Sequence, residues 1–168
     1  MNPHGNLPTS GCPLFSEFVH NFAAIDRVPL PPQHTVLFLA VDARAVPTEA
    51  IASAAERLLA SGLVYICVWG PDCERVHDIF DEVYAGDGST EPSFTLMSTW
   101  HSHESLEEAL WFFIEHAVPV DTEITTTSYL CITVRHRGWA TAVRDVLSNL
   151  GDFRTRMVDD ESHPNGRT

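Results

Sequence analysis

The sequence contains no lysine. All ten of its basic residues are arginine, set against 23 aspartates and glutamates, and the formal net charge is −13. Because clustered lysine and arginine give proteins their affinity for phosphate backbones, this composition argues against direct binding to nucleic acid. An acidic surface also keeps ordinary proteins in solution, so the charge alone does not establish a partner.

Long apolar runs are absent as well. The longest, TVLFLAV at 35–41, falls far short of the roughly 18 residues that span a bilayer. The first thirteen residues have no basic stretch followed by an apolar one, so they do not resemble a signal peptide. We therefore expect a cytoplasmic protein without a membrane segment.

Several common site motifs are missing. The four cysteines, Cys12, Cys67, Cys73 and Cys131, show no CxxC spacing, which argues against a disulfide framework or a zinc ribbon. The sequence has no HExxH motif, no GxGxxG and no P-loop lysine, so the usual zinc-protease and nucleotide-binding motifs are excluded. Cys67 and Cys131 lie inside apolar runs, where a free cysteine behaves as a small hydrophobe.

The length and the apolar content favour one globular domain. With 168 residues and 44% hydrophobic content, the chain is long enough to bury a proper core. Proline, glycine and asparagine are frequent near the N-terminus, and the last ten residues are polar. We expect a single domain over 14–158, with flexible tails at 1–13 and 159–168.

Buried strands and helices are expected to alternate along this domain. The apolar runs that predict strands lie at 34–43, 63–70, 94–100 and 125–134, with a possible edge strand at 153–158. Helical spacing predicts helices at 14–25 and 47–61, from Asp72, from the capping box of Ser105 and Glu108, and at 139–150. The predicted fold is α/β: a small doubly wound, flavodoxin-like or Rossmann-like sheet of four to five strands, mainly parallel, with helices on both faces and an extra N-terminal helix.

Polar and titratable residues follow the ends of the predicted strands. Ligands of such sheets bind outside the carboxyl ends of the strands. Asp42 and Arg44 follow the first strand and Asp72 follows the second, so these three residues are candidates for ligand binding. His136 and Arg137 follow the fourth strand and reach the same edge.

A cysteine hydrolase is one interpretation of this edge. Cys73 lies in the first turn of a predicted helix, where the helix dipole lowers the pKa of a thiol. A histidine from the loop after the third strand could pair with this thiol, and the candidate catalytic residues are Cys73, His101 and Glu104. Against this, Asp72 favours the neutral thiol, and Cys73 shares its helix face with apolar residues of the core.

A zinc site is the second chemical interpretation. Cys73 and His77 are four residues apart and therefore share a helix face. His101 and His103 could complete a tetrahedral set of sulfur and nitrogen ligands. Otherwise, no cofactor is expected.

The placement of the acidic residues favours a third interpretation. Between Asp72 and Glu123 thirteen acids face a single arginine, so this segment carries almost all of the net negative charge. Helices at 72–86 and 105–117 would present these acids to a basic protein partner, as immunity proteins and inhibitors do. We favour an acidic binding protein of immunity, inhibitor or accessory type. The alternative is a small hydrolase-like enzyme, with a cysteine nucleophile or zinc, at the C-terminal edge of the sheet.

Overall fold

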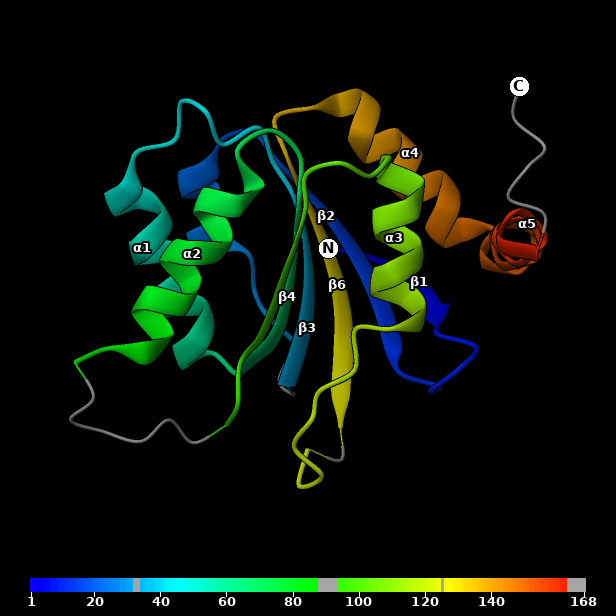
Figure 1. Ribbon diagram of the computed structural model, residues 1–168, viewed down its shortest axis with the longest axis horizontal. Helices are drawn as coiled ribbons and strands as arrows, with labels where there is room; N and C mark the ends of the chain where they lie inside the picture. The colour runs from blue at the N-terminus through cyan, green and yellow to red at the C-terminus, as the bar shows by residue number, and fades with distance from the viewer. Residues whose placement is uncertain (32–33, 88–93, 125, 163–168) are drawn as a thin grey trace.

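A six-stranded sheet forms the centre of the computed structural model, which describes residues 1–31, 34–87, 94–124 and 126–162 (Figure 1). The strands lie in the order β1-β2-β6-β3-β4-β5. All neighbours are parallel except β1 and β2, which are antiparallel. The strands are β1 (Asn2–Asn6), β2 (Pro13–Val19), β3 (His34–Ala40), β4 (Leu63–Trp69), β5 (Met97–His101) and β6 (Thr127–Val134).

Helices cover both faces of this sheet (Figure 1). One face carries the 3₁₀ helix η1 (Phe22–Arg27), α1 (Thr48–Ala60) and α2 (Cys73–Ala85). The other carries α3 (Leu106–Glu115), α4 (Arg137–Ser148) and α5 (Leu150–Ser162). The α/β class and a mostly parallel sheet are therefore confirmed, although the described residues form six strands where four to five are expected. None of the helices in the described ranges has the length and apolar character needed to cross a membrane.

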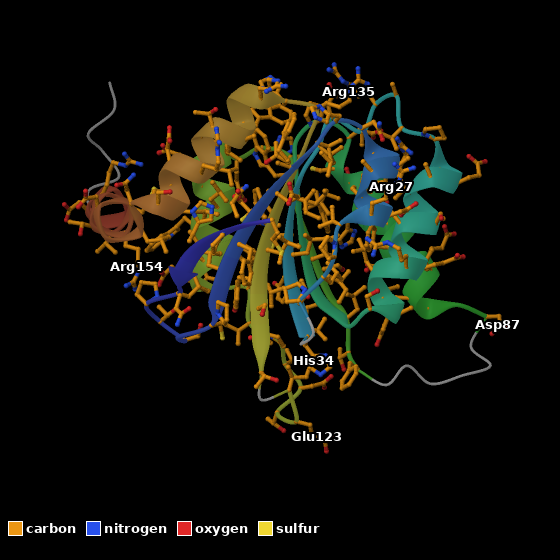
Figure 2. The ribbon with its side chains drawn as sticks, turned by 180° about the vertical axis from the view of Figure 1, so that it is seen from behind. Arg27, His34, Asp87, Glu123, Arg135 and Arg154 are labelled. Atoms are coloured by element: carbon orange, nitrogen blue, oxygen red, sulfur yellow. The ribbon has the colours of Figure 1, made fainter. Side chains whose placement is uncertain are left out.

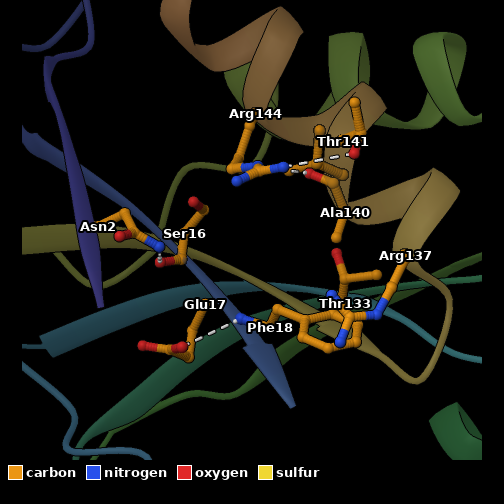
Figure 3. A pocket seen from close by; sticks show the side chains of 10 residues that line it. Asn2, Ser16, Glu17, Phe18, Thr133, Arg137, Ala140, Thr141 and Arg144 are labelled. Atoms are coloured by element: carbon orange, nitrogen blue, oxygen red, sulfur yellow. Dashed lines mark hydrogen bonds between the residues drawn. The ribbon is translucent and has the colours of Figure 1, made fainter. Parts of the chain in front are cut away.

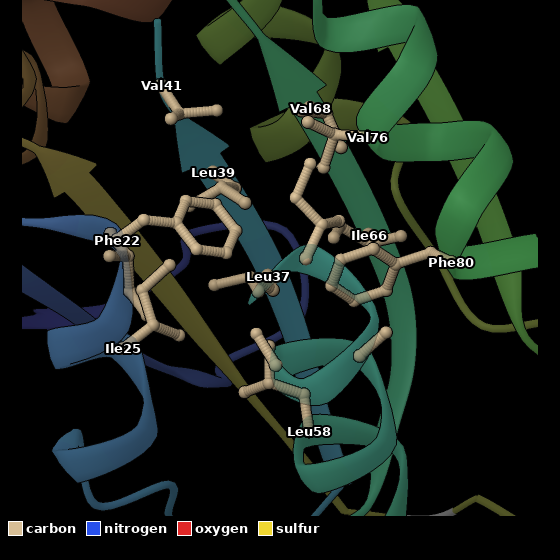
Figure 4. Packing of buried hydrophobic residues seen from close by; sticks show 14 of the residues in the cluster. Phe22, Ile25, Leu37, Leu39, Val41, Leu58, Ile66, Val68, Val76 and Phe80 are labelled. Carbon is tan, nitrogen blue, oxygen red and sulfur yellow. The ribbon is translucent and has the colours of Figure 1, made fainter. Parts of the chain in front are cut away.

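The two layers of helices explain why the central strands are apolar on both sides. Leu37 and Leu39 of β3 pack into the core beneath η1, α1 and α2, as Figure 4 shows. Phe38 and Ala40, between them in sequence, pack into the core beneath α3, α4 and α5. A strand covered on both faces gains from apolar side chains at every position, so it has no polar alternation.

The predicted N-terminal helix at 14–25 is wrong. Residues Pro13–Val19 form β2, which pairs in parallel with β6, and only Phe22–Arg27 is helical, as the 3₁₀ helix η1. Short apolar runs fit a helix and a strand about equally well. Phe15, Phe18 and Val19 are residue types that strands favour, and pairing along β6 decides the outcome.

Both ends of the chain also differ from expectation. Asn2–Asn6, within the segment expected to be a flexible tail, forms β1, and Leu7 after it is buried. The possible edge strand at 153–158 is wrong, because these residues belong to α5. Phe153 and Met157, four residues apart, lie on one face of that helix and are both buried. The last six residues of the expected C-terminal tail lie outside the described residues.

Candidate functional site

The candidate residues lie at the end of the sheet where its parallel strands finish. Figure 2 shows Arg135, which follows β6, at this end, with His34 and Glu123 at the opposite end. Gly70, directly after β4, has φ +115°, and a Cβ atom there would overlap the carbonyl oxygen of Val41. Only glycine therefore lets the segments after β3 and β4 approach so closely.

The three residues expected to bind a ligand, Asp42, Arg44 and Asp72, all form ion pairs within the chain itself. Arg44 Nε donates to Asp42 Oδ1 at 2.9 Å, and the guanidinium of Arg44 lowers the pKa of Asp42. Arg75 Nε donates to Asp72 Oδ2 at 2.7 Å, and Arg75 Nη2 donates to the carbonyl oxygen of Ala43 at 2.6 Å. Arg75 thus connects the start of α2 to the segment after β3.

Asp72 precedes α2, as expected, but it does not cap the helix through its side chain. Its backbone has φ 65°, in the left-handed region, and its carboxylate makes no capping hydrogen bond. The carboxylate pairs instead with Arg75, which lies within the first turn. The start of α2 is therefore held by an ion pair. Most helices use a hydrogen bond to the side chain of the N-cap residue for this purpose.

Cys73 is fully buried in the core beneath α1 and α2. Burial raises the pKa of its thiol, although the backbone N–H groups of His101 and of the first turn of α2 favour the thiolate. It is the backbone of His101 that reaches the sulfur. The His101 ring lies on the other face of β5, 4.8 Å from the Phe112 ring between centroids. The structure does not bring the thiol and the imidazole together.

His101 is instead joined to Glu104 and Thr99. His101 Nδ1 lies 2.6 Å from Glu104 Oε2, and His101 Nε2 lies 3.1 Å from Thr99 Oγ1. Trp69 Nε1 donates to the carbonyl oxygen of Glu104 at 2.9 Å, which holds the loop after β5 against β4. Two of the three candidate catalytic residues, His101 and Glu104, are therefore in contact, but the other ring nitrogen of His101 contacts the hydroxyl of Thr99 and not the thiol of Cys73.

His77 belongs to a separate cluster on the α2 side of β5. His77 Nδ1 lies 3.0 Å from Asp78 Oδ1, and His77 Nε2 lies 3.0 Å from Ser98 Oγ. Ser98 Oγ donates to Asp81 Oδ1 at 2.6 Å. A hydroxyl has one hydrogen to donate, so Ser98 accepts from His77. A serine activated by a histidine needs the opposite direction, in which the hydroxyl donates to the imidazole.

The four proposed zinc ligands lie in four different surroundings. Cys73 lies in one core, His101 faces the opposite core, His77 faces Ser98, and His103 is exposed in the loop after β5. Within the described ranges, no three histidine, cysteine or carboxylate side chains are grouped so as to hold one metal ion.

The structure also contains a cavity that the sequence analysis missed. It measures about 210 Å³ and lies between α4 and the outer strands of the sheet (Figure 3). Its lining includes Ser16 and Phe18 of β2, Thr133 of β6, and Arg137 and Arg144 of α4. The spacing of the two arginines, seven residues apart, was the available signal. Of the strands that line the cavity, β6 was predicted but β1 and β2 were not, so that signal pointed to no site.

Residues 19–149 match a family described as a domain of unknown function, DUF7684. The chain belongs to the DUF7684 family. The part that matches DUF7684 runs from the last residue of β2 to the residue after α4, so β1, most of β2 and α5 lie outside it. No curated protein and no solved structure matches the chain.

Proposed function

We propose that this DUF7684 protein is a cytoplasmic acidic binding domain that engages a basic segment of a protein partner through α2 and the free edge of β5. The α2–β5 surface consists of Glu74, Asp78, Asp81, Glu82 and Trp100. The observation that carries the proposal is Trp100, which is 45% exposed on an edge strand that packs against α2, the helix that carries these carboxylates. Tryptophan is enriched at protein–protein interfaces, so an exposed tryptophan is a candidate for contact with a partner.

The distribution of ion pairs supports α2 over α3 as the binding helix. On α3, Glu115 pairs with Arg154 and Glu107 pairs with Arg156, both from α5. On α2, Glu74 and Glu82 are exposed and make no ion pair with any described residue. Two of the α3 carboxylates are already neutralised within the chain, so the field that attracts a basic partner is strongest at α2.

The edge of the sheet offers a way to hold an extended segment. β5 pairs with β4 on one side and, among the described strands, has no neighbour on the other. An extended peptide can add to such an edge through backbone hydrogen bonds, with alternate side chains facing the neighbouring helix. Arginine or lysine at those positions would meet the α2 carboxylates and the Trp100 ring, which attracts cations over its face.

The packing of Trp100 supports a preformed site. Its ring lies 4.5 Å from the His77 ring between centroids, and His77 is held by Asp78 and Ser98. A side chain that is already ordered loses less conformational entropy when a partner binds. Trp100 is therefore the expected anchor of the interface.

The hydrolase alternative draws less support from the geometry. Its nucleophile, Cys73, is buried without an imidazole at its sulfur, and the His101 ring contacts Thr99 and Glu104 instead. A thiol activated by a base requires the two groups within hydrogen-bond reach. The reactivity of the Cys73 thiol in the native protein separates the two functions.

Chemical-shift mapping tests the proposal. The ¹⁵N-labelled protein is titrated with a ten-residue peptide of alternating arginine and valine, and separately with the same peptide carrying glutamine for arginine. We expect saturable shifts in Met97–His101 and along α2 with the arginine peptide only, weakened by added salt and reduced in Trp100→Ala. Shifts centred on α3, or equal shifts with the glutamine peptide, would contradict the proposal.

A further inference from the structure

The cavity between α4 and the outer strands lies on the opposite face of the sheet from α2. Ser16 and Thr133, which line it, are almost completely buried. Ala140 and Val143 of α4 also line it and are buried. Phe18 adds an aromatic ring beside them. The cavity thus combines two buried hydroxyl-bearing residues with apolar side chains.

Two arginines give this cavity its charge. Arg137 and Arg144 both line it, and within the described ranges neither makes an ion pair with a carboxylate. Among the arginines that the structure describes, five others do make one, namely Arg44, Arg57, Arg75, Arg154 and Arg156. In a chain with a net charge of −13, two guanidinium groups that line one cavity and lack a carboxylate are unusual.

The contacts that these two arginines do make are weak, and their partners are uncharged groups. Arg144 donates to the carbonyl oxygen of Ala140 and to Thr141 Oγ1, each at 3.3 Å. The Arg137 guanidinium lies over the Phe18 ring, 5.5 Å from its centroid. Figure 3 shows Arg144 at one side of the cavity and Arg137 with Phe18 at the other.

The one carboxylate in the lining is already engaged. Glu17 contacts the amino terminus at Met1, and its Oε1 accepts the backbone N–H of Phe18 at 3.1 Å. It therefore does not neutralise either arginine. The positive charge in the cavity is left for a ligand.

We propose that this cavity binds a small organic acid. The carboxylate of the ligand accepts hydrogen bonds from Arg144 and Arg137, which are the donors best suited to planar carboxylate oxygens. The apolar part of the ligand packs against Phe18, Ala140 and Val143. A volume of about 210 Å³ is below the range of sites for drug-sized ligands, so the ligand is a small one.

The hydroxyl groups of Ser16 and Thr141 add specificity for small organic acids. Ser16 Oγ lies 2.8 Å from His4 Nε2, and Thr141 already accepts from Arg144, so the polar rim is held in place before a ligand arrives. Because the cavity and the α2–β5 surface lie on opposite faces of the sheet, each can be occupied or removed without the other. The two sites have separate tests.

Benzoate is a suitable probe, with benzyl alcohol as its neutral counterpart and inorganic phosphate as an anion without an apolar part. Titration of the ¹⁵N-labelled protein with benzoate should give saturable shifts at Ser16, Phe18, Thr133 and Thr141. Arg144→Gln and Arg137→Gln should each weaken benzoate binding about tenfold, since each removes a charge-assisted hydrogen bond. Arg27→Gln, an exposed arginine on the other face of the sheet, should leave the affinity unchanged.

Each other outcome overturns part of the proposal. Equal binding of benzyl alcohol would show an apolar cavity without selectivity for anions. Phosphate that binds as tightly as benzoate at the same amides would overturn the organic-acid class. Absence of saturable shifts, or equal weakening by Arg27→Gln, would overturn the site itself.

Discussion

Arg154 of α5 makes a two-point ion pair with Glu115 of α3. Arg154 Nε lies 2.7 Å from Glu115 Oε1, and Arg154 Nη2 lies 3.1 Å from Glu115 Oε2. The Glu115 side chain is only 13% exposed, so most of its contact is with the protein and Arg154 is its ion-pair partner. The pair joins a helix within the DUF7684 match to one outside it, and it removes a carboxylate from the acidic surface.

We expect the Glu115–Arg154 ion pair to contribute measurably to stability. The Glu107–Arg156 ion pair, which joins the same two helices, should contribute little. A double-mutant cycle of Glu115→Gln and Arg154→Gln should give a coupling energy of about 1 kcal/mol in urea unfolding, because the geometry is two-point and partly buried. The Glu107–Arg156 pair has one contact, at 3.1 Å, between side chains that are both more than half exposed. Its cycle should give about 0.3 kcal/mol or less. Equal coupling in the two cycles would contradict the structure.

Much of the fold could be predicted from the sequence, because the central strands have a strong signal. Strands expected at 34–43 and 63–70 correspond to β3 and β4, and those at 94–100 and 125–134 correspond to β5 and β6. The capping box of Ser105 and Glu108 is also present as expected. These features depend on local chemistry or on burial from both sides, and both leave a clear pattern.

The parts that were missed depend on contacts between distant segments. The strand β2 is stabilised by its pairing with β6, which is far away in the sequence. The helix α5 is stabilised by packing such as that of Phe153 against Trp111 of α3. The cavity beneath α4 needs β2 to exist, so its arginines could not be assembled into a site. The sequence placed Cys73 and His101 near one another, but strand alternation sends the His101 ring to the opposite face.

His101 is expected to be a structural residue. His101→Ala removes two hydrogen-bond contacts and the packing against Phe112 from a nearly buried position, and it should lower the free energy of unfolding by about 2 kcal/mol. His103→Ala is the control, since His103 is exposed two residues away; it should change stability by less than about 0.5 kcal/mol. Similar losses in both variants would show that the His101 contacts do not hold the loop.

Thiol labelling distinguishes a structural Cys73 from a catalytic one. Burial raises the pKa of Cys67 to about 12 and also raises that of Cys73 and Cys131. Cys12 is the one partly exposed cysteine. At pH 8 the native protein should therefore react rapidly with DTNB at Cys12 alone, and Cys12→Ser should remove that phase. Labelling of Cys73 before unfolding would favour the hydrolase alternative.

The N-terminal strand should make stability depend on pH. Burial and the nearby Arg144 charge lower the pKa of His4 below its usual 6.5, and His4 contacts Ser16 and Ser148. The unfolded state then binds more protons than the folded state below about pH 6.5, so stability falls as the pH drops through the window between 6.5 and the lowered value.

Urea unfolding at pH 7 and pH 5 measures this effect. The wild-type protein should lose more stability on acidification than His4→Asn, which has no proton to gain. His20→Asn, a change at an exposed histidine, should behave like the wild type. If His4→Asn shows the same loss as the wild type, the pH dependence comes from other groups.

The affinity of the alternating arginine–valine peptide for charge-matched variants tests the binding surface most directly. Glu74→Gln with Glu82→Gln removes two carboxylates from the α2–β5 surface, and Asp145→Asn with Asp152→Asn removes two exposed carboxylates from α4 and α5. We expect about tenfold weaker binding in the first variant, from the loss of two exposed ion pairs of up to about 1 kcal/mol each, and unchanged affinity in the second. Equal weakening in both variants would show that net charge alone attracts the peptide, and would contradict a binding site on α2 and β5.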